Sequence, residues 1–110
     1  MNNKDIRLDL LRKLEANPGY TQRKLSNEMG VSLGKINYCL NKLIEKGWIK
    51  LSNFNKNPNK AGYMYLLTAK GIEHKSKLTY TFLKIKIKEY EMLKEEINLL
   101  KKDLSIEKSL

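Results

Sequence analysis

This 110-residue sequence is poor in the residues that build metal centres, disulfides and catalytic sites. It contains one cysteine, Cys39, and one histidine, His74. A single cysteine excludes an intrachain disulfide, a Cys-x-x-Cys redox pair and a four-cysteine metal site. We interpret Cys39 as a small buried apolar residue and His74 as a solvated surface residue. Because the sequence has no Gly-rich phosphate loop and no His/Cys/carboxylate cluster at ligand spacing, we expect no enzyme activity, metal or cofactor.

Long apolar segments are also missing. No segment approaches the about 20 apolar residues that a membrane-spanning helix requires. The first residues, MNNKDIRLDLL, lack the apolar core of about 7 to 15 residues that marks a secretory signal. We therefore expect a soluble cytoplasmic protein in which Cys39 is reduced.

Positive charge is abundant. The chain has 22 Lys and Arg against 12 Asp and Glu, a formal net charge of +10. Residues 1–75 hold 14 basic and 6 acidic residues, a net of +8, and residues 76–110 hold 8 and 6, a net of +2. This excess predicts a polyanionic partner that binds the N-terminal part of the chain.

Turn residues divide the first 75 residues into short elements. Apolar spacing predicts a helix over 4–16, a short helix ending at Gly30, and a longer helix over 32–46. Residues 48–67 are typical of a β-hairpin, and a further helix follows from Ala69. Helix caps and stops are expected at Thr21, Gly30, Ser32, Gly47 and Thr68. This order predicts a mainly α fold with a small β-hairpin wing, the winged helix-turn-helix, over residues 1–75.

The third predicted helix has a polar face and an apolar face, the latter formed by Ile36, Leu40, Leu43 and Ile44 with Leu33 close by. Lysine can contact guanine, asparagine can pair with adenine, and tyrosine can bond phosphate; the amino end of a helix also attracts phosphate. From Ser32 to Lys60 there are six lysines and one acid. We therefore predict these DNA contacts on the second and third helices and the hairpin tip: Thr21, Gln22, Arg23, Ser32, Gly34, Lys35, Asn37, Tyr38, Asn41, Lys42, Lys56, Asn57 and Lys60.

These contacts predict a sequence-specific DNA-binding regulator. Helix 32–46 would enter the major groove, and the wing, residues 53–61, would lie on the flanking backbone or in the minor groove. Two alternatives remain open, namely a protein-interaction module that presents the same face to an acidic partner, and a non-specific DNA-binding protein.

Residues 76–110 are predicted to form a long, coiled-coil-like dimerisation helix. Apolar residues recur at heptad spacing, and the predicted dimer seam is Leu83, Ile87, Tyr90, Leu93, Ile97, Leu100 and Leu104. The flanking g positions hold Glu89, Glu96 and Asp103, and the e positions hold Lys94, Lys101 and Lys108. A parallel pair would set these acids against these lysines, whereas an antiparallel pair would set like charges together, so the charges favour a parallel homodimer.

Three features of this segment leave alternatives open. A second apolar row, consisting of Ile85, Met92, Leu99 and Ile106, could pack on a partner's first helix or support a higher assembly. The alternation of apolar residues and lysines over 78–88 is typical of a strand, although continuity with the heptads favours a helix. A lone helix folded back on its own domain, or an interfacial membrane helix over 77–88, would also fit the pattern.

The segments TQRKLSNEMGVSLGKINYCLNKLIEKGWIK and GYMYLLTAKGIEHK resemble the winged helix-turn-helix of MarR-family transcriptional regulators, and most closely a short subgroup associated with exopolysaccharide loci. The resemblance extends over roughly residues 5–95. It implies a homodimer on a palindromic operator, usually acting as a repressor. The wing lacks the Asp-x-Arg element common in the family, and a helix bracketing the domain is expected only at the C-terminal side. We therefore expect no small-molecule effector.

Overall fold

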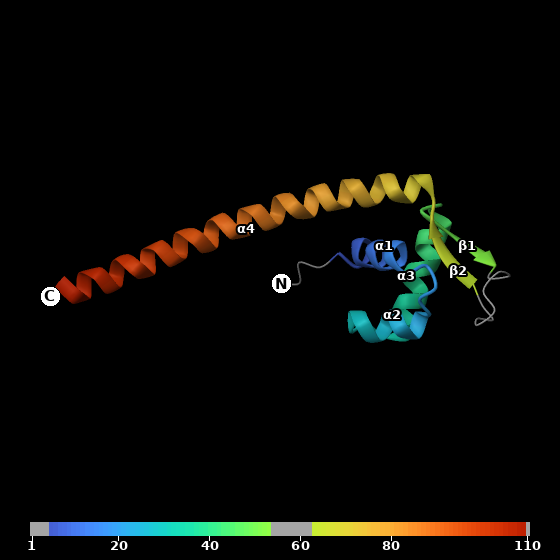
Figure 1. The fold of residues 1–110 in the computed structure, drawn as a ribbon, viewed down its shortest axis with the longest axis horizontal. Helices are drawn as coiled ribbons and strands as arrows, with labels where there is room; N and C mark the ends of the chain where they lie inside the picture. Colours follow the sequence, from blue (N-terminus) through green and yellow to red (C-terminus); the bar gives the residue numbers. More distant parts are fainter. Residues whose placement is uncertain (1–4, 54–62, 110) are drawn as a thin grey trace. The chain divides into compact units, whose positions relative to one another are not determined.

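The structure, a computed structural model, describes residues 5–53 and 63–109. Its elements, in chain order, are α1 (Ile6–Ala16), α2 (Gln22–Met29), α3 (Leu33–Glu45), β1 (Ile49–Asn53), β2 (Tyr63–Leu67) and α4 (Ala69–Ser109) (Figure 1). The predicted fold is confirmed: three helices and a two-stranded antiparallel hairpin are followed by one long helix.

Local capping sets where the helices begin. α1 begins at Ile6 because Asp5 is its N-cap, with a side chain that accepts hydrogen bonds from the backbone nitrogens of Arg7 and Leu8. Thr21 and Ser32 cap α2 and α3 as predicted: each side-chain oxygen accepts from the backbone nitrogen three residues on, at 3.0 Å and 3.2 Å. These bonds satisfy amide groups that have no partner within the helix.

Two glycines permit the turns that follow α2 and α3. Gly30 has φ of 65° and Gly47 has φ of 74°, both in the left-handed region that residues with a side chain seldom adopt. Gly30 ends α2, and Gly47 follows the C-cap residue Lys46. Both stops lie where the sequence predicts them.

The core lies among α1, α2, α3 and the beginning of the hairpin. α1 packs against α2, α3 and β2, and Figure 1 shows these elements gathered together. The fully buried side chains are Leu10, Leu11, Leu14, Leu25, Ile36, Leu40, Leu43 and Ile49. Each contributes about 1.5–3 kcal/mol relative to an exposed position. On α3 the predicted apolar face is buried, except that Ile44 is half-buried and Leu33 is 43% exposed.

The hairpin is held on both edges of β2. Its strands pair from Ile49 opposite Leu67 to Asn53 opposite Tyr63. On the other edge, the backbone nitrogen of Tyr65 donates to the carbonyl of Pro18, in the loop between α1 and α2, at 3.2 Å. The position of Tyr65 is therefore fixed by its own hairpin and by the loop that precedes the helix-turn-helix.

The interpretation of His74 as a solvated surface residue is wrong. His74 is half-buried and stacks on Trp48, with ring centroids 4.2 Å apart and planes inclined by 14°. Cys39 packs against the core as an apolar residue, as interpreted, but it is half-buried and not fully buried. Tertiary packing decides the environment of His74, because its neighbours in sequence give no sign of the contact with Trp48.

α4 is a continuous helix of 41 residues, so residues 78–88 are helical despite their alternating pattern. The chain divides into two compact units, Met1–Leu78 and Thr79–Leu110, and the boundary falls within α4. The predicted division after residue 75 stays a prediction. None of the described helices has the length and hydropathy needed to cross a membrane.

Candidate nucleic-acid interface

The turn between α2 and α3 is fixed by reciprocal hydrogen bonds. The backbone nitrogen of Val31 donates to the carbonyl of Ser26 at 3.2 Å, and the Ser26 hydroxyl donates back to the carbonyl of Val31. Leu25 and Met29 on α2, together with Ile36 on α3, bury the inner faces of the two helices. The outer face of α3 is thereby held toward solvent.

That outer face carries a cluster of one aromatic ring and two lysines, which we call the α3 cluster: Lys35, Tyr38 and Lys42. Tyr38 is 58% exposed. The ammonium groups of Lys35 and Lys42 lie 6.0 Å and 5.5 Å from the centre of its ring. Cation–π attraction holds both charges near the ring while they stay hydrated. Lys42 also pairs with Glu45 at 3.3 Å, so Lys35 is the member of the cluster with no carboxylate partner among the described residues.

A second group of predicted contacts forms a hydrogen-bonded chain, which we call the amide network. Asn41 Nδ2 donates to Asn37 Oδ1 at 3.3 Å, and Asn37 Nδ2 donates to Gln22 Oε1 at 3.3 Å. Gln22 Nε2 then donates to the Tyr65 hydroxyl at 3.1 Å. Three residues predicted to contact DNA are therefore joined across α2 and α3. Sequence reasoning missed Tyr65, and no local pattern relates residue 65 to residue 22.

The remaining predicted contacts on α2 and α3 are exposed. Thr21 and Ser32 use their oxygens as helix caps, which leaves each hydroxyl proton able to donate to a phosphate. Arg23 and Gly34 are also exposed. A Cβ added to Gly34 would meet no atom within 4 Å. The wing contacts Lys56, Asn57 and Lys60 lie outside the described residues.

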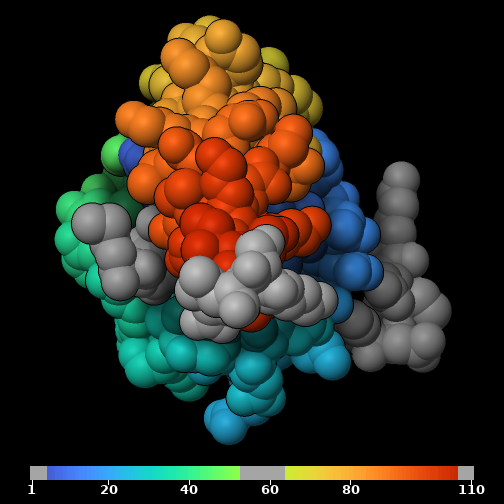
Figure 2. Space-filling view, turned by 90° about the vertical axis from the view of Figure 1, so that its left-hand side faces the viewer, coloured from blue at the N-terminus to red at the C-terminus, as the bar shows by residue number. Residues whose placement is uncertain are grey.

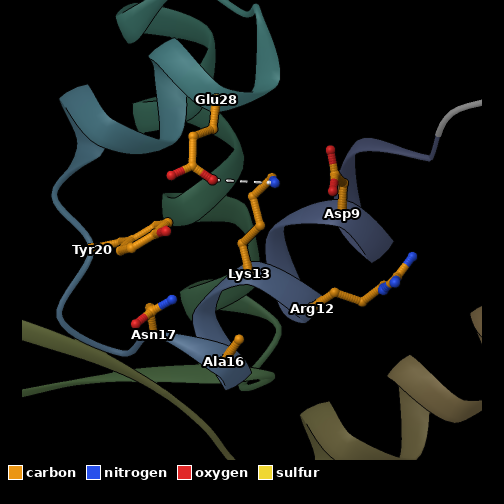
Figure 3. A pocket seen from close by; sticks show the side chains of 7 residues that line it. All are labelled: Asp9, Arg12, Lys13, Ala16, Asn17, Tyr20 and Glu28. Carbon is orange, nitrogen blue, oxygen red and sulfur yellow. Dashed lines mark ion pairs between the residues drawn. The ribbon is translucent and has the colours of Figure 1, made fainter.

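A hollow of about 450 Å³ lies between α1 and α2, and none of the residues that line it is a predicted DNA contact (Figure 3). Lys13 reaches from α1 to Glu28 on α2 at 3.5 Å. Tyr20 donates a hydrogen bond to Glu28; this bond, with the charges of Lys13 and Lys24, lowers the pKa of Glu28 against the opposing effect of desolvation. The same hydrogen bond raises the pKa of Tyr20. These contacts tie the helix-turn-helix to α1.

Groups of acidic, histidine and cysteine side chains do not gather in the described part of the chain. No three of them converge in a way that could hold a metal ion. The polar groups that do converge on the outer face of α3 are amides, hydroxyls and lysines, which bind phosphates and base edges.

The C-terminal unit presents apolar side chains to solvent. All seven residues of the predicted dimer seam are exposed, from 43% at Ile97 to 64% at Leu100. The second apolar row is exposed as well, from 46% at Ile85 to 60% at Ile106. Figure 2 faces the C-terminal end of α4, whose surface is drawn in orange and red. Large exposed apolar surfaces are typical of interaction sites, and the dimer seam stays a prediction.

Comparison with known proteins identifies the fold. Residues 4–50 match the profile of a winged helix-turn-helix DNA-binding family. No curated protein matches the sequence. The matched region includes α1, α2 and α3, and with α3 the outer face described above. The N-terminal unit, Met1–Leu78, is therefore a winged helix-turn-helix domain.

Solved structures with the same fold are transcriptional regulators. The PcaV regulator from Streptomyces coelicolor, in complex with its natural ligand, has a TM-score of 0.64 and 19% identity over 76% of this chain and 57% of its own. A MarR transcriptional regulator from Methanosarcina mazei has a TM-score of 0.53 and 21% identity, over 72% of this chain and 53% of its own. A MarR/EmrR-family regulator from Acinetobacter sp. ADP1 has a TM-score of 0.60 and 20% identity, over 89% of this chain and 70% of its own. The chain thus spans little more than half the length of the first two, and shares its fold with MarR-family regulators.

Proposed function

We propose that this protein is a DNA-binding transcription regulator that reads DNA with α3. The observation that carries the proposal is the α3 cluster together with the amide network, because both lie on the outer face of the third helix of a winged helix-turn-helix domain. Lys35 and Lys42 supply positive charge, and the amides supply paired donors and acceptors of the kind that discriminate bases.

The other contacts follow from this placement. With α3 in the major groove, the amino end of α2, carrying Thr21 and Arg23, would meet phosphates. The wing, residues 53–61, would supply Lys56, Asn57 and Lys60 to the flanking backbone or minor groove. Each phosphate that is neutralised releases counterions, so the affinity should fall steeply with salt.

The proposed active species is a homodimer joined through the predicted dimer seam of α4. Two copies of α3 would then reach two half-sites about one helical turn, 34–36 Å, apart on a palindromic operator. Following the resemblance noted in the sequence, we propose that it acts as a repressor in the cytoplasm. The comparisons with known proteins give no support to the exopolysaccharide-associated subgroup, which rests on sequence resemblance alone. The absence of a small-molecule effector stays a prediction.

The test is selection of bound sequences from a pool of random DNA duplexes, followed by titrations with the selected duplex. Enrichment of a palindrome supports specific binding by a dimer. Binding without enrichment favours non-specific coating, and no binding at moderate salt favours the protein-interaction alternative. Either of these last two outcomes contradicts the proposal.

Lys35→Ala is the sharpest variant for the titrations. It should weaken binding and reduce the slope of log K against log salt by about 1, because one phosphate or base contact is lost. Lys102→Ala, at an exposed position of α4 outside the proposed interface, is the matched control and should leave both unchanged. If Lys35→Ala behaves like Lys102→Ala, α3 is not the reading helix.

A further inference from the structure

The amide network has a uniform direction. Asn41 donates to Asn37, Asn37 donates to Gln22, and Gln22 donates to the hydroxyl of Tyr65. A carboxamide has a donor end and an acceptor end, and a half-turn exchanges them. The orientation of each amide in the network is therefore coupled to that of the next, and the hydroxyl of Tyr65 anchors the inner end by holding Gln22 in place.

Burial changes along the network. Tyr65 and Gln22 are half-buried, whereas Asn37 and Asn41 are exposed on α3. Tyr65 is also fixed by its backbone, which pairs with Leu51 across the hairpin and bonds to Pro18 on the other side. The network thus runs from a rigid, sheltered anchor on β2 to the solvent-facing surface that would meet DNA.

The outer end of the network presents an ordered pair of groups. Asn41 uses one N–H of its amide within the network, so among the described residues its Oδ1 and its second N–H have no other partner. An amide oxygen beside an amide N–H matches the donor and acceptor that adenine shows in the major groove. If the amide were turned over, these two groups would exchange positions and the match would be lost.

We propose that Tyr65 is a positioning residue for base recognition: through Gln22, it holds the side-chain amides of Asn37 and Asn41 in place for adenine. This inference rests on the proposed function. It places a determinant of specificity on the wing strand, in a residue that need not touch DNA.

The test is Tyr65→Phe, which removes only the hydroxyl. We expect discrimination between the preferred base and its competitors, at the positions facing Asn37 and Asn41, to fall about tenfold, the scale of one bidentate contact. The unfolding midpoint and the salt slope should be unchanged, because no core atom and no positive charge is removed. Tyr80→Phe is the control: Tyr80 is a 66% exposed tyrosine on α4, outside the amide network.

A double-substitution cycle separates positioning from a direct contact. In a Gln22→Ala background the link between Tyr65 and α3 is already broken, so Tyr65→Phe should have no further effect on base preference. An undiminished effect in that background would overturn the proposed route through Gln22.

A readout without DNA keeps the inference testable by itself. In 15N-labelled protein, Tyr65→Phe should shift the side-chain NH₂ signals of Gln22, Asn37 and Asn41, although Asn41 does not touch Tyr65. If the natural chain enriches no DNA sequence, the proposed function falls, and this inference with it. If it enriches one and Tyr65→Phe selects the same bases as strongly, or leaves the signals of Asn37 and Asn41 unmoved, only this inference falls.

Discussion

Gly71 lies directly against the backbone of Trp48. A Cβ added to Gly71 would overlap the carbonyl oxygen of Trp48 and lie 2.8 Å from its carbonyl carbon. The same oxygen accepts a hydrogen bond from the backbone nitrogen of Thr68 at 2.9 Å, and the Thr68 hydroxyl oxygen accepts from Gly71 at 3.0 Å. The first turn of α4 is therefore locked onto the residue that joins α3 to β1.

We expect Gly71→Ala to destabilise the winged helix-turn-helix domain by about 2–3 kcal/mol, because the new methyl group meets backbone that cannot move aside cheaply. Urea unfolding followed by Trp48 fluorescence and circular dichroism measures the change. A free energy of unfolding within 0.5 kcal/mol or so of the natural value would contradict the close packing, since surface substitutions have effects of that size.

Gly34→Ala should have the opposite effect on stability. Gly34 lies in the first turn of α3, and a Cβ there meets nothing within 4 Å, so the gain in helix propensity should stabilise the fold by up to about 1 kcal/mol. On DNA the same methyl group would stand between α3 and the groove, and affinity should fall about tenfold, equivalent to 1.4 kcal/mol. Titration of the selected duplex at fixed salt checks this, and unchanged affinity would exclude a close approach at Gly34.

The positions of the helices could be predicted because their signals are local. Thr21 and Ser32 cap α2 and α3 by accepting a hydrogen bond from the backbone nitrogen three residues further on. Gly30 and Gly47 adopt the left-handed backbone that ends the same two helices. The apolar periodicity of residues 32–46 likewise identifies the buried face of α3, and with it the outward face.

The contacts that organise the interface could not be predicted because they join residues far apart in sequence. Gln22 and Tyr65 meet only once the hairpin packs beside the loop at Pro18. His74 stacks on Trp48 only because α4 begins against the Trp48 carbonyl. Periodicity marks which face of a helix is polar, but it does not show which polar side chains bond to one another.

Acid should loosen the contact between α1 and α2. The pKa of Glu28 lies below its ordinary value of 4.5 in the folded state. A lowered folded-state pKa gives a stability contribution that is complete above the unfolded value and is lost as the pH falls through the folded value. The free energy of unfolding should therefore decrease from pH 6 to pH 3, and Glu28→Gln should reduce this decrease. Glu73→Gln, a carboxylate on the surface of α4 paired with Lys77, is the control and should change the pH profile less.

The two apolar rows of α4 can be told apart by one charge in each. Ile97→Asp puts an unpaired carboxylate from each chain into the proposed seam, which should raise the dimer Kd about 100-fold, or 3 kcal/mol. Leu99→Asp makes a similar change in the second row and should leave the Kd nearly unchanged. Sedimentation equilibrium over a range of concentrations measures both. The reverse order of effects would move the dimer interface to the second row.

Charge reversal at the flanks of the seam distinguishes the two orientations of the coil. In a parallel pair Glu96 of one chain faces Lys101 of the other, so Glu96→Lys should weaken the dimer a few-fold at low salt, because each exposed pair contributes about 0.2–1 kcal/mol. Adding Lys101→Glu should restore the affinity, since opposite charges face each other again. In an antiparallel pair Glu96 faces an acidic g position, so Glu96→Lys would leave the dimer equally strong or tighten it. Whether Glu96→Lys weakens or strengthens the dimer therefore decides the orientation of the coil. If the change in affinity disappears at about 1 M salt, the effect is electrostatic.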